Sequence, residues 1–316
     1  MNGGSSKARL EQVIAGVGQV VVGKQEALRT LLVGLLADGH ILLEDLPGLG
    51  KTLIAKSFSS ALGLAFTRVQ FTADLLPTDI TGGEIYDPSS GKFSFRKGPV
   101  FTHILLADEI NRAPPKVQSA LLESMQEYQV TSEGTTYPLE RPFLVMATQN
   151  PIELEGTYPL PEAQVDRFLL RLTVGYPTAG EERAILARRR LAKTELQPPP
   201  AVLAPGEFRG LQTAVENVSI TPALEGYIVD LVSATRADPR VEVGASPRGS
   251  LALAKLSRAK ALLEGRDFVL PDDVKSLALS ALAHRIVIKP EPWIRGLRGT
   301  TVVSEVIRKV PVPKVG

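Results

Sequence analysis

A segment of small residues around one lysine has the composition of a phosphate-binding loop. It runs Leu46-Pro47-Gly48-Leu49-Gly50-Lys51-Thr52, after an apolar stretch and at the start of a helical pattern. Small residues allow backbone N–H groups to face phosphate oxygens, and the positive end of the following helix favours the same anion. Lys51 would reach the β- and γ-phosphates of a nucleotide, and the Thr52 hydroxyl would bind Mg²⁺. We therefore expect nucleotide contacts from Pro47, Gly48, Leu49, Gly50, Lys51, Thr52 and Leu53.

The first position of this loop departs from the usual G-x-x-x-x-G-K-[ST] pattern, because it is occupied by Asp45. A carboxylate close to a triphosphate is unfavourable. We therefore expect Asp45 to point away from the phosphates or to cap the turn. The alternative is a chance Gly-Lys-Thr turn, which the surrounding strand–loop–helix pattern disfavours.

Two adjacent acids follow another apolar stretch. Asp108 and Glu109 come directly after Ile104–Ala107, 57 residues beyond Lys51. Since the carboxyl ends of parallel strands meet at the ligand crevice, Asp108 would orient Mg²⁺ and its waters. Glu109 could polarise the attacking water as a general base. An acid pair alone is weak evidence, but together with the loop it predicts a P-loop ATPase or GTPase, and the lack of an Asn-Lys-x-Asp sequence disfavours a GTPase.

Short apolar runs alternate with helical patterns in the first part of the chain, and these elements must position the loop and the acids. Such alternation predicts an α/β fold with a mostly parallel five-stranded sheet between helices. The predicted strands are Ile41–Leu43, Phe66–Val69, Ile104–Ala107, Phe143–Ala147 and Phe168–Val174, and the predicted helices are Lys24–Ala37, Lys51–Leu62 and Pro114–Glu127. Two predicted hairpins interrupt the pattern, Glu84–Phe95 with its turn at Ser89-Ser90-Gly91 and Val130–Leu139 with its turn at Glu133-Gly134.

The character of the chain changes near Tyr176-Pro177. Residues 1–177 hold 15 basic and 19 acidic residues, net −4, whereas residues 178–316 hold 21 and 15, net +6. We therefore predict a nucleotide-binding core over 1–177 and a smaller all-helical domain over 178–316. The helices predicted in the second part are Glu181–Ala192, Thr221–Ala234, Pro247–Glu264 and Pro271–Ala283.

The composition excludes several classes of protein. The hydrophobic fraction of 44% is that of a globular protein, and the absence of cysteine excludes disulfides and thiolate chemistry. Three histidines without metal-ligand spacing make a zinc enzyme a poor candidate. The net charge of +2 argues against a protein that coats nucleic acid. No apolar run suits a membrane span or a signal peptide, so we expect a cytoplasmic protein with a loose terminus at Met1–Ser6.

Five segments together resemble the MoxR family of AAA+ ATPases, and the resemblance covers nearly the whole chain. It implies an AAA+ core followed by a helical lid. The matching segments are Gly39-His40-Ile41-Leu42-Leu43-Glu44-Asp45 before the loop, Asp108-Glu109-Ile110-Asn111-Arg112-Ala113 as the second motif, Ala147-Thr148-Gln149-Asn150-Pro151 as the sensor-1 strand, Leu160-Pro161-Glu162-Ala163-Gln164-Val165-Asp166-Arg167-Phe168, and Ser246-Pro247-Arg248 at the sensor-2 helix.

The resemblance implies roles for further residues, each with a plainer alternative. Asn150 would hold the γ-phosphate or the attacking water, or would merely cap the turn before Pro151. Arg167 would be an arginine finger that reaches the nucleotide of the neighbouring subunit, a contact that can be worth ~10³–10⁵ in rate. Arg171 is the rival for that role. Arg248 would contact phosphate from the lid of the same subunit, or would form a surface ion pair.

Two further places resemble functional parts of the family. Val21-Val22-Gly23 resembles the adenine side of the nucleotide pocket, with plain core packing as the alternative. Arg112 either bridges subunits or pairs with a nearby acid. The two predicted hairpins either contact a client protein transiently or only decorate the surface.

The family resemblance implies a function as well as a fold. It implies a homo-oligomeric, hexameric ring that hydrolyses ATP to ADP with Mg²⁺. Such a ring would remodel, mature or activate partner protein complexes, for example by inserting a metal or cofactor alongside a von Willebrand factor type A domain protein. The alternative is an AAA+ nucleic-acid motor or transcription activator, which the near-neutral charge and the lack of a helix-turn-helix or zinc module disfavour. A switch that binds ATP without turnover is disfavoured by Glu109 and Arg167.

Overall fold

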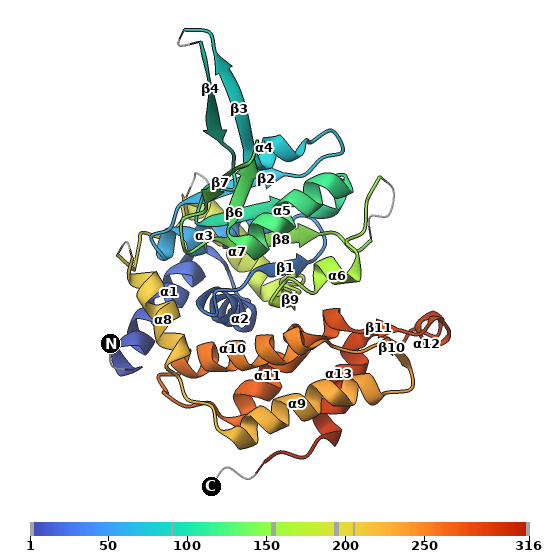
Figure 1. Cartoon of the computed structure of the whole chain (residues 1–316). Coiled ribbons are helices and arrows are strands. Elements are labelled where there is room, and N and C mark those ends of the chain that lie inside the picture. The colour runs from blue at the N-terminus through green and yellow to red at the C-terminus, as the bar shows by residue number, and fades with distance from the viewer. Residues whose placement is uncertain (1–2, 90, 153–155, 193–195, 205, 314–316) are drawn as a thin grey trace.

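A parallel sheet of five strands forms the centre of the first part of the molecule. The structure is a computed structural model that describes residues 3–89, 91–152, 156–192, 196–204 and 206–313 (Figure 1). The strands lie in the order β2-β5-β8-β1-β9, and each neighbouring pair is parallel. Their bounds are β1 Ile41–Glu44, β2 Phe66–Gln70, β5 Ile104–Asp108, β8 Leu144–Gln149 and β9 Leu170–Leu172.

The register of this sheet brings polar residues to one edge. Glu44 at the end of β1 lies opposite Gln149 of β8, and Gln70 at the end of β2 lies opposite Asp108 of β5. Apart from Thr148 of β8, apolar side chains fill the rest of the central strands β1, β5 and β8 and are buried on both faces, as a parallel sheet requires. The carboxyl ends of the strands therefore offer the polar side chains for a site.

Helices cover both faces of the sheet. Ile41 and Leu43 pack into one hydrophobic cluster together with α1, α2 and α3, whereas Leu42 packs into a second cluster together with α5. The bounds are α1 Gly3–Val20, α2 Gln25–Leu36, α3 Lys51–Ala61, α4 Pro77–Thr81, α5 Pro115–Glu127 and α6 Glu162–Val165, with a 3₁₀ turn η1 at Ile110–Arg112. The predicted helices of this part are confirmed to within one residue at each end.

The N-terminal segment differs from the prediction made from the sequence. The expectation of a loose terminus was wrong for residues 3–6, because α1 begins at Gly3 and Ser6 is fully buried, whereas Met1 and Asn2 lie outside the described residues. The last predicted strand, Phe168–Val174, is also shorter in the structure, where β9 spans only Leu170–Leu172. Phe168 is buried in the core, so its apolar side chain serves packing rather than a strand.

Both predicted hairpins are present. The first consists of β3 Gly82–Asp87 and β4 Lys92–Lys97, and Figure 1 shows it projecting beyond the rest of the molecule. The second consists of β6 Gln129–Ser132 and β7 Thr135–Pro138. Each is an antiparallel pair outside the central sheet, and Ser90 of the first turn lies outside the described residues.

A second layer of helices lies below the sheet in Figure 1. Helix α10 packs against α8, α9 and α11 and also contacts α1 and α2 of the first part. A short antiparallel pair, β10 with β11, makes this lid mainly rather than wholly helical. The bounds are α7 Ala179–Ala192, α8 Glu207–Glu216, α9 Pro222–Ala237, β10 Val241–Val243, α10 Pro247–Leu263, α11 Pro271–Leu282, η2 Ala283–Arg285, β11 Val287–Ile288, α12 Pro290–Ile294 and α13 Gly299–Lys309.

The hydrophobic cluster on one face of the sheet continues into the lid, since it holds residues such as Leu31 of α2 and Leu256 of α10. Because both parts of the chain contribute to one hydrophobic cluster, the domain boundary near residue 177 stays a prediction from the sequence. None of the helices in the described part of the chain is both long and apolar enough to cross a membrane.

Candidate nucleotide-binding site

The glycine-rich loop lies between the end of β1 and the start of α3. Gly48 and Gly50 have φ angles of +80° and +78°, a conformation that glycine adopts without strain. The Lys51 ammonium donates to the carbonyls of Asp45 at 2.8 Å and Leu46 at 3.1 Å, so it folds back across the loop. Burial lowers the pKa of Lys51, and the nearby carboxylates, that of Asp45 first, oppose this shift. The loop thus presents a cation at the amino end of a helix.

Asp45 points away from the loop, as the sequence analysis expected. Its side chain is buried, and its carboxylate accepts from the backbone N–H groups of Val174 and, at 3.0 Å, Gly175. These two hydrogen bonds satisfy the buried carboxylate of Asp45 on the side of β9. They also tie the end of β1 to the segment that follows β9.

Asp108 is held from two sides at the end of β5. Its Oδ1 accepts from the Thr148 hydroxyl at 2.6 Å, and its Oδ2 accepts from Arg68 Nε at 3.0 Å and Nη2 at 2.8 Å. Thr148 comes from β8 and Arg68 from β2, the two strands that flank β5. The sheet order therefore fixes the orientation of this carboxylate.

Glu109 turns out of the strand into the same space. Its φ of +57° is uncommon for a residue with a side chain, and its N–H donates to Thr148 Oγ1 at 2.8 Å. The carboxylate accepts from Gln70 Nε2 at 2.7 Å and pairs with Arg112 at 2.8 Å. Arg112 therefore pairs with an acid of its own chain, one of the two readings that the sequence left open. A bridge between subunits remains untested.

These side chains line one cavity of about 450 Å³ at the carboxyl edge of the sheet. Lys51 and Thr52 face it from the loop, and Asp108 and Glu109 from the strand end. Asn150 completes that set from the end of β8. The remaining predicted loop residues that line it are Pro47, Gly48, Leu49, Gly50 and Leu53. The cavity thus gathers most of the residues predicted from two distant motifs.

Asn150 keeps both of its proposed readings. It lines the cavity and is buried, which suits contact with a ligand. Its Oδ1 also accepts from the N–H of Ile152 at 3.3 Å, as a turn cap would. The turn cap uses the amide oxygen of Asn150, so the amide nitrogen can still contact a ligand.

Four cavity residues had no role assigned from the sequence: Arg68, Gln70, Thr148 and Gln149. Arg68 and Gln70 are polar residues two apart on β2, a weak signal for a face turned toward a site. Thr148 lay inside a recognised motif but had no role assigned. Their contacts with the acids depend on the strand order, which the sequence does not show.

The remaining predicted residues lie elsewhere. Arg167 and Arg248 line a second cavity of about 300 Å³, and this cavity shares no lining residue with the first within the described ranges. Arg248 pairs with Asp166 at 3.6 Å, which is the kind of surface ion pair given as its alternative, and it is not among the lining residues of the first cavity. Arg171 pairs with Glu44 at 3.1 Å. Val22 and Gly23 do not line the first cavity, and Gly23 packs closely against Glu181.

A glycine-rich loop and an acid pair converge at one edge of a parallel sheet, and a helical lid follows; this combination defines a P-loop nucleotide-binding protein of the AAA class. Comparison with known families agrees. Residues 40–170 match the model for the ATPase family associated with various cellular activities (AAA), and residues 233–306 match the AAA lid domain.

Relatives narrow the class. Chaperone MoxR1 of Mycobacterium tuberculosis is 45% identical over an alignment of 317 positions, which covers 97% of this chain and 83% of that protein. The uncharacterized protein YeaC of Bacillus subtilis is 47% identical over 306 residues, 96% of this chain and 95% of that one. A crystal structure of a provisionally assigned ATPase from Cytophaga hutchinsonii has a TM-score of 0.91 at 42% identity, covering 99% of this chain and 97% of that chain. The chain belongs to the MoxR family of AAA+ ATPases.

Proposed function

We propose that the chain binds Mg²⁺ and ATP, hydrolyses the ATP to ADP and phosphate, and uses this cycle to remodel partner proteins. One observation carries the proposal: Lys51, Thr52, Asp108, Glu109 and Asn150 line a single cavity. Family membership supports nucleotide binding by this cavity.

The donor set of the cavity fits a magnesium ion. The Thr52 hydroxyl and the Asp108 carboxylate both line it, and Mg²⁺ takes oxygen ligands, with one or two carboxylates beside phosphate oxygens. The bound metal would supply charge neutralisation at the phosphates. Thr148 keeps Asp108 oriented toward that position, and Lys51 contributes the second positive charge.

Glu109 is the proposed general base. Its carboxylate is held by Gln70 and Arg112 at hydrogen-bonding distance, so its position is defined before a water is activated. For Glu109→Gln we expect ATP binding to be retained and kcat to fall steeply, because the amide keeps the size of the side chain but cannot take a proton. Steady-state phosphate release and calorimetry measure the two quantities. Undiminished kcat would place the base elsewhere.

The second cavity supports a shared site between subunits. Arg167 lines it without an ion pair to any side chain in the described part of the chain, and its buried Nε has no hydrogen-bond partner there. A guanidinium in this state is available for a neighbour's phosphate. We propose that Arg167 serves the adjacent subunit of a hexameric ring, and that Arg248, beside it, serves the same neighbour rather than its own chain.

The remodelling part of the proposal draws on the relatives and on the hairpins. One relative of similar length is named a chaperone. The hairpin of β3 and β4 exposes Ile85, Tyr86 and Phe93, apolar side chains suited to transient contact with a client protein. We propose that the client is a protein complex under maturation, with metal or cofactor insertion and a von Willebrand factor type A domain partner as the specific case.

A pull-down with Glu109→Gln chains in ATP tests this part. Those chains should retain client proteins, and Lys51→Ala chains, which cannot hold ATP, serve as the matched control. Equal recovery by both variants would contradict an ATP-dependent client cycle. Salt-resistant binding of the wild-type chain to DNA would instead favour the nucleic-acid motor.

A further inference from the structure

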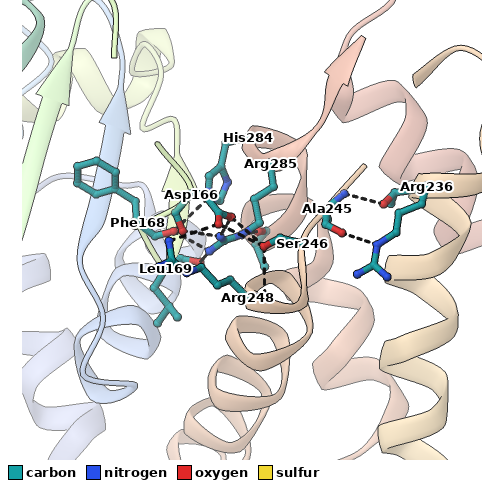
Figure 2. Close-up of polar contacts among 11 residues, drawn as sticks. Asp166, Phe168, Leu169, Arg236, Ala245, Ser246, Arg248, His284 and Arg285 are labelled. Atoms are coloured by element: carbon teal, nitrogen blue, oxygen red, sulfur yellow. Dashed lines mark hydrogen bonds and ion pairs between the residues drawn. The ribbon is translucent and has the colours of Figure 1, made fainter. Parts of the chain in front are cut away.

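The residues on either side of Arg167 are bound by the lid. Arg285 of η2 donates through Nη1 to the carbonyl of Asp166 at 2.6 Å and also pairs with the Asp166 carboxylate. Its Nη2 donates to the carbonyl of Phe168 at 2.7 Å, and His284 Nε2 lies 3.2 Å from the same carbonyl. Figure 2 shows these side chains reaching from the lid toward the segment that contains Arg167.

A second lid element converges on the same acid. Ser246, which caps α10, donates to Asp166 Oδ2 at 3.2 Å, and Arg248 lies 3.6 Å from that oxygen (Figure 2). Asp166 thus joins both η2 and the start of α10 to the residue before Arg167. The segment around Asp166 is therefore attached to the lid at two places, η2 and the start of α10, and not only through one surface ion pair.

Burial makes the Arg285 attachment hard to break. The side chain of Arg285 is only 2% exposed, and its Nε donates to the carbonyl of Ala281 in α11 at 2.8 Å. A buried guanidinium that loses its acceptors keeps its charge without solvation, which is strongly unfavourable. Movement of α11 must therefore either carry the segment at Asp166 with it or break these bonds.

The core holds the other side of the segment. Phe168 is fully buried in the hydrophobic cluster beside α5, and the N–H of Leu169 donates to the carbonyl of His40 at 2.8 Å. The backbone on both sides of Arg167 is therefore attached to the lid, and on the side of Phe168 and Leu169 it is also attached to the core.

We propose that Arg285 is a positioning residue for Arg167: it couples the orientation of the lid to the direction of the finger offered to the neighbouring subunit. The inference rests on the proposed role of Arg167 in the neighbour's site. A chain whose lid shifts would thereby turn its finger toward or away from the adjacent nucleotide.

Substitution of Arg285 by methionine tests the proposal. Arg285→Met keeps an unbranched, though shorter, side chain and removes the hydrogen bonds and the ion pair of the guanidinium with the segment. We expect kcat to fall by up to about 100-fold, the effect of misplacing a reacting group by about 1 Å, with ATP affinity unchanged. Arg285→Lys should recover part of the loss. Arg266→Met, which removes a mostly buried pair with Asp273 inside the lid, is the matched control and should keep kcat.

Mixed oligomers separate positioning from a general structural defect. Arg285→Met chains mixed with Lys51→Ala chains should regain activity, because an intact loop then meets an intact finger. Arg285→Met chains mixed with Arg167→Ala chains should regain none, because both lack a working finger. Recovery in the second mixture would overturn the proposal, since it would show that the finger of Arg285→Met is intact.

A double variant gives an independent reading. Arg285→Met should lower kcat no further in a chain that already carries Arg167→Ala, whereas an equal further loss would contradict the coupling. If Arg285→Met does not fold by circular dichroism, Asp166→Asn removes the same ion pair at constant size and enters the same mixtures. Full activity of the Arg167→Ala variant alone would instead refute the proposed role of Arg167 in the neighbour's site. The single variant therefore separates failure of the proposed function from failure of the coupling through Arg285.

Discussion

Thr148 is the residue that joins the two acids of the site. Its hydroxyl donates to Asp108 and accepts from the N–H of Glu109, and the side chain is only 1% exposed. One hydroxyl thus holds the carboxylate of the proposed magnesium ligand and the backbone of the proposed base. Arg68 and Gln70 add contacts from the neighbouring strand, although the larger exposure of Arg68 screens its charge.

Thr148→Val should therefore affect stability and activity together. Valine keeps the shape but leaves a buried carboxylate oxygen and a buried N–H without their partner, a loss of about 1–3 kcal/mol in the free energy of unfolding. Denaturant titration measures this change. Thr136→Val on the exposed hairpin strand β7 is the control and should stay within about 0.5 kcal/mol of wild type. Equal behaviour of the two variants would remove Thr148 from the site.

We expect nucleotide binding to depend most directly on Lys51. Among the described residues, it is the one positively charged side chain of the loop that lines the cavity. Its ammonium group donates to two backbone carbonyls of the loop. We expect Lys51→Ala to abolish tight binding of Mg·ATP, because the β- and γ-phosphates lose their partner. Calorimetry with Mg·ATP measures the affinity. Near-native affinity would refute the assignment of the loop.

The elements of the fold were predictable to different degrees. Buried strands such as Ile104–Ala107 were found because parallel strands are continuous apolar runs. Helix α1 was missed altogether, since glycine and serine dominate its first turns, and α8 and α13 were missed although their apolar residues recur at helical spacing. Contacts made by Arg68 and Arg248 could not be predicted, because they depend on strand order and on how the lid docks.

His40 links three elements and gives a prediction about pH. Its Nδ1 accepts from the N–H of Val145 in β8 at 3.0 Å, and its Nε2 lies 2.9 Å from the carbonyl of Met125 in α5. A neutral ring with its proton on Nε2 satisfies both contacts. Burial lowers the pKa of His40 from 6.5 to about 4. Protonation is therefore disfavoured in the folded state relative to the unfolded one.

Stability should fall as the pH drops from about 6.5 toward 4, because the unfolded chain takes up the proton first. The full difference in pKa, from 6.5 to about 4, corresponds to roughly 3 kcal/mol. Unfolding measurements between pH 7 and pH 5 cover the part of this pH range in which most carboxyl groups stay ionised. His40→Gln should flatten the slope there, and an unchanged slope would assign the pH dependence to other groups.

At the scale of the whole molecule, the proposed nucleotide cavity and the proposed finger residue Arg167 lie at separate places. The first lies at the carboxyl edge of the sheet, and Arg167 lies in a second cavity beside α10. The net charges of −4 and +6 on residues 1–177 and 178–316 favour contact between unlike parts of adjacent subunits. Screening limits that attraction to about 8–10 Å at physiological salt. Assembly would therefore complete a site that one chain leaves open.

Mixing two inactive variants tests this claim most directly. Arg167→Ala chains keep the loop, Lys51→Ala chains keep the finger, and a complete site forms only where the two meet. ATP affinity of Arg167→Ala alone should stay near that of wild type, because the finger acts on the transition state. We predict that phosphate release per chain in the mixture clearly exceeds that of either variant. A mixture no more active than its parts, with wild-type turnover independent of protein concentration, would contradict a site shared between subunits.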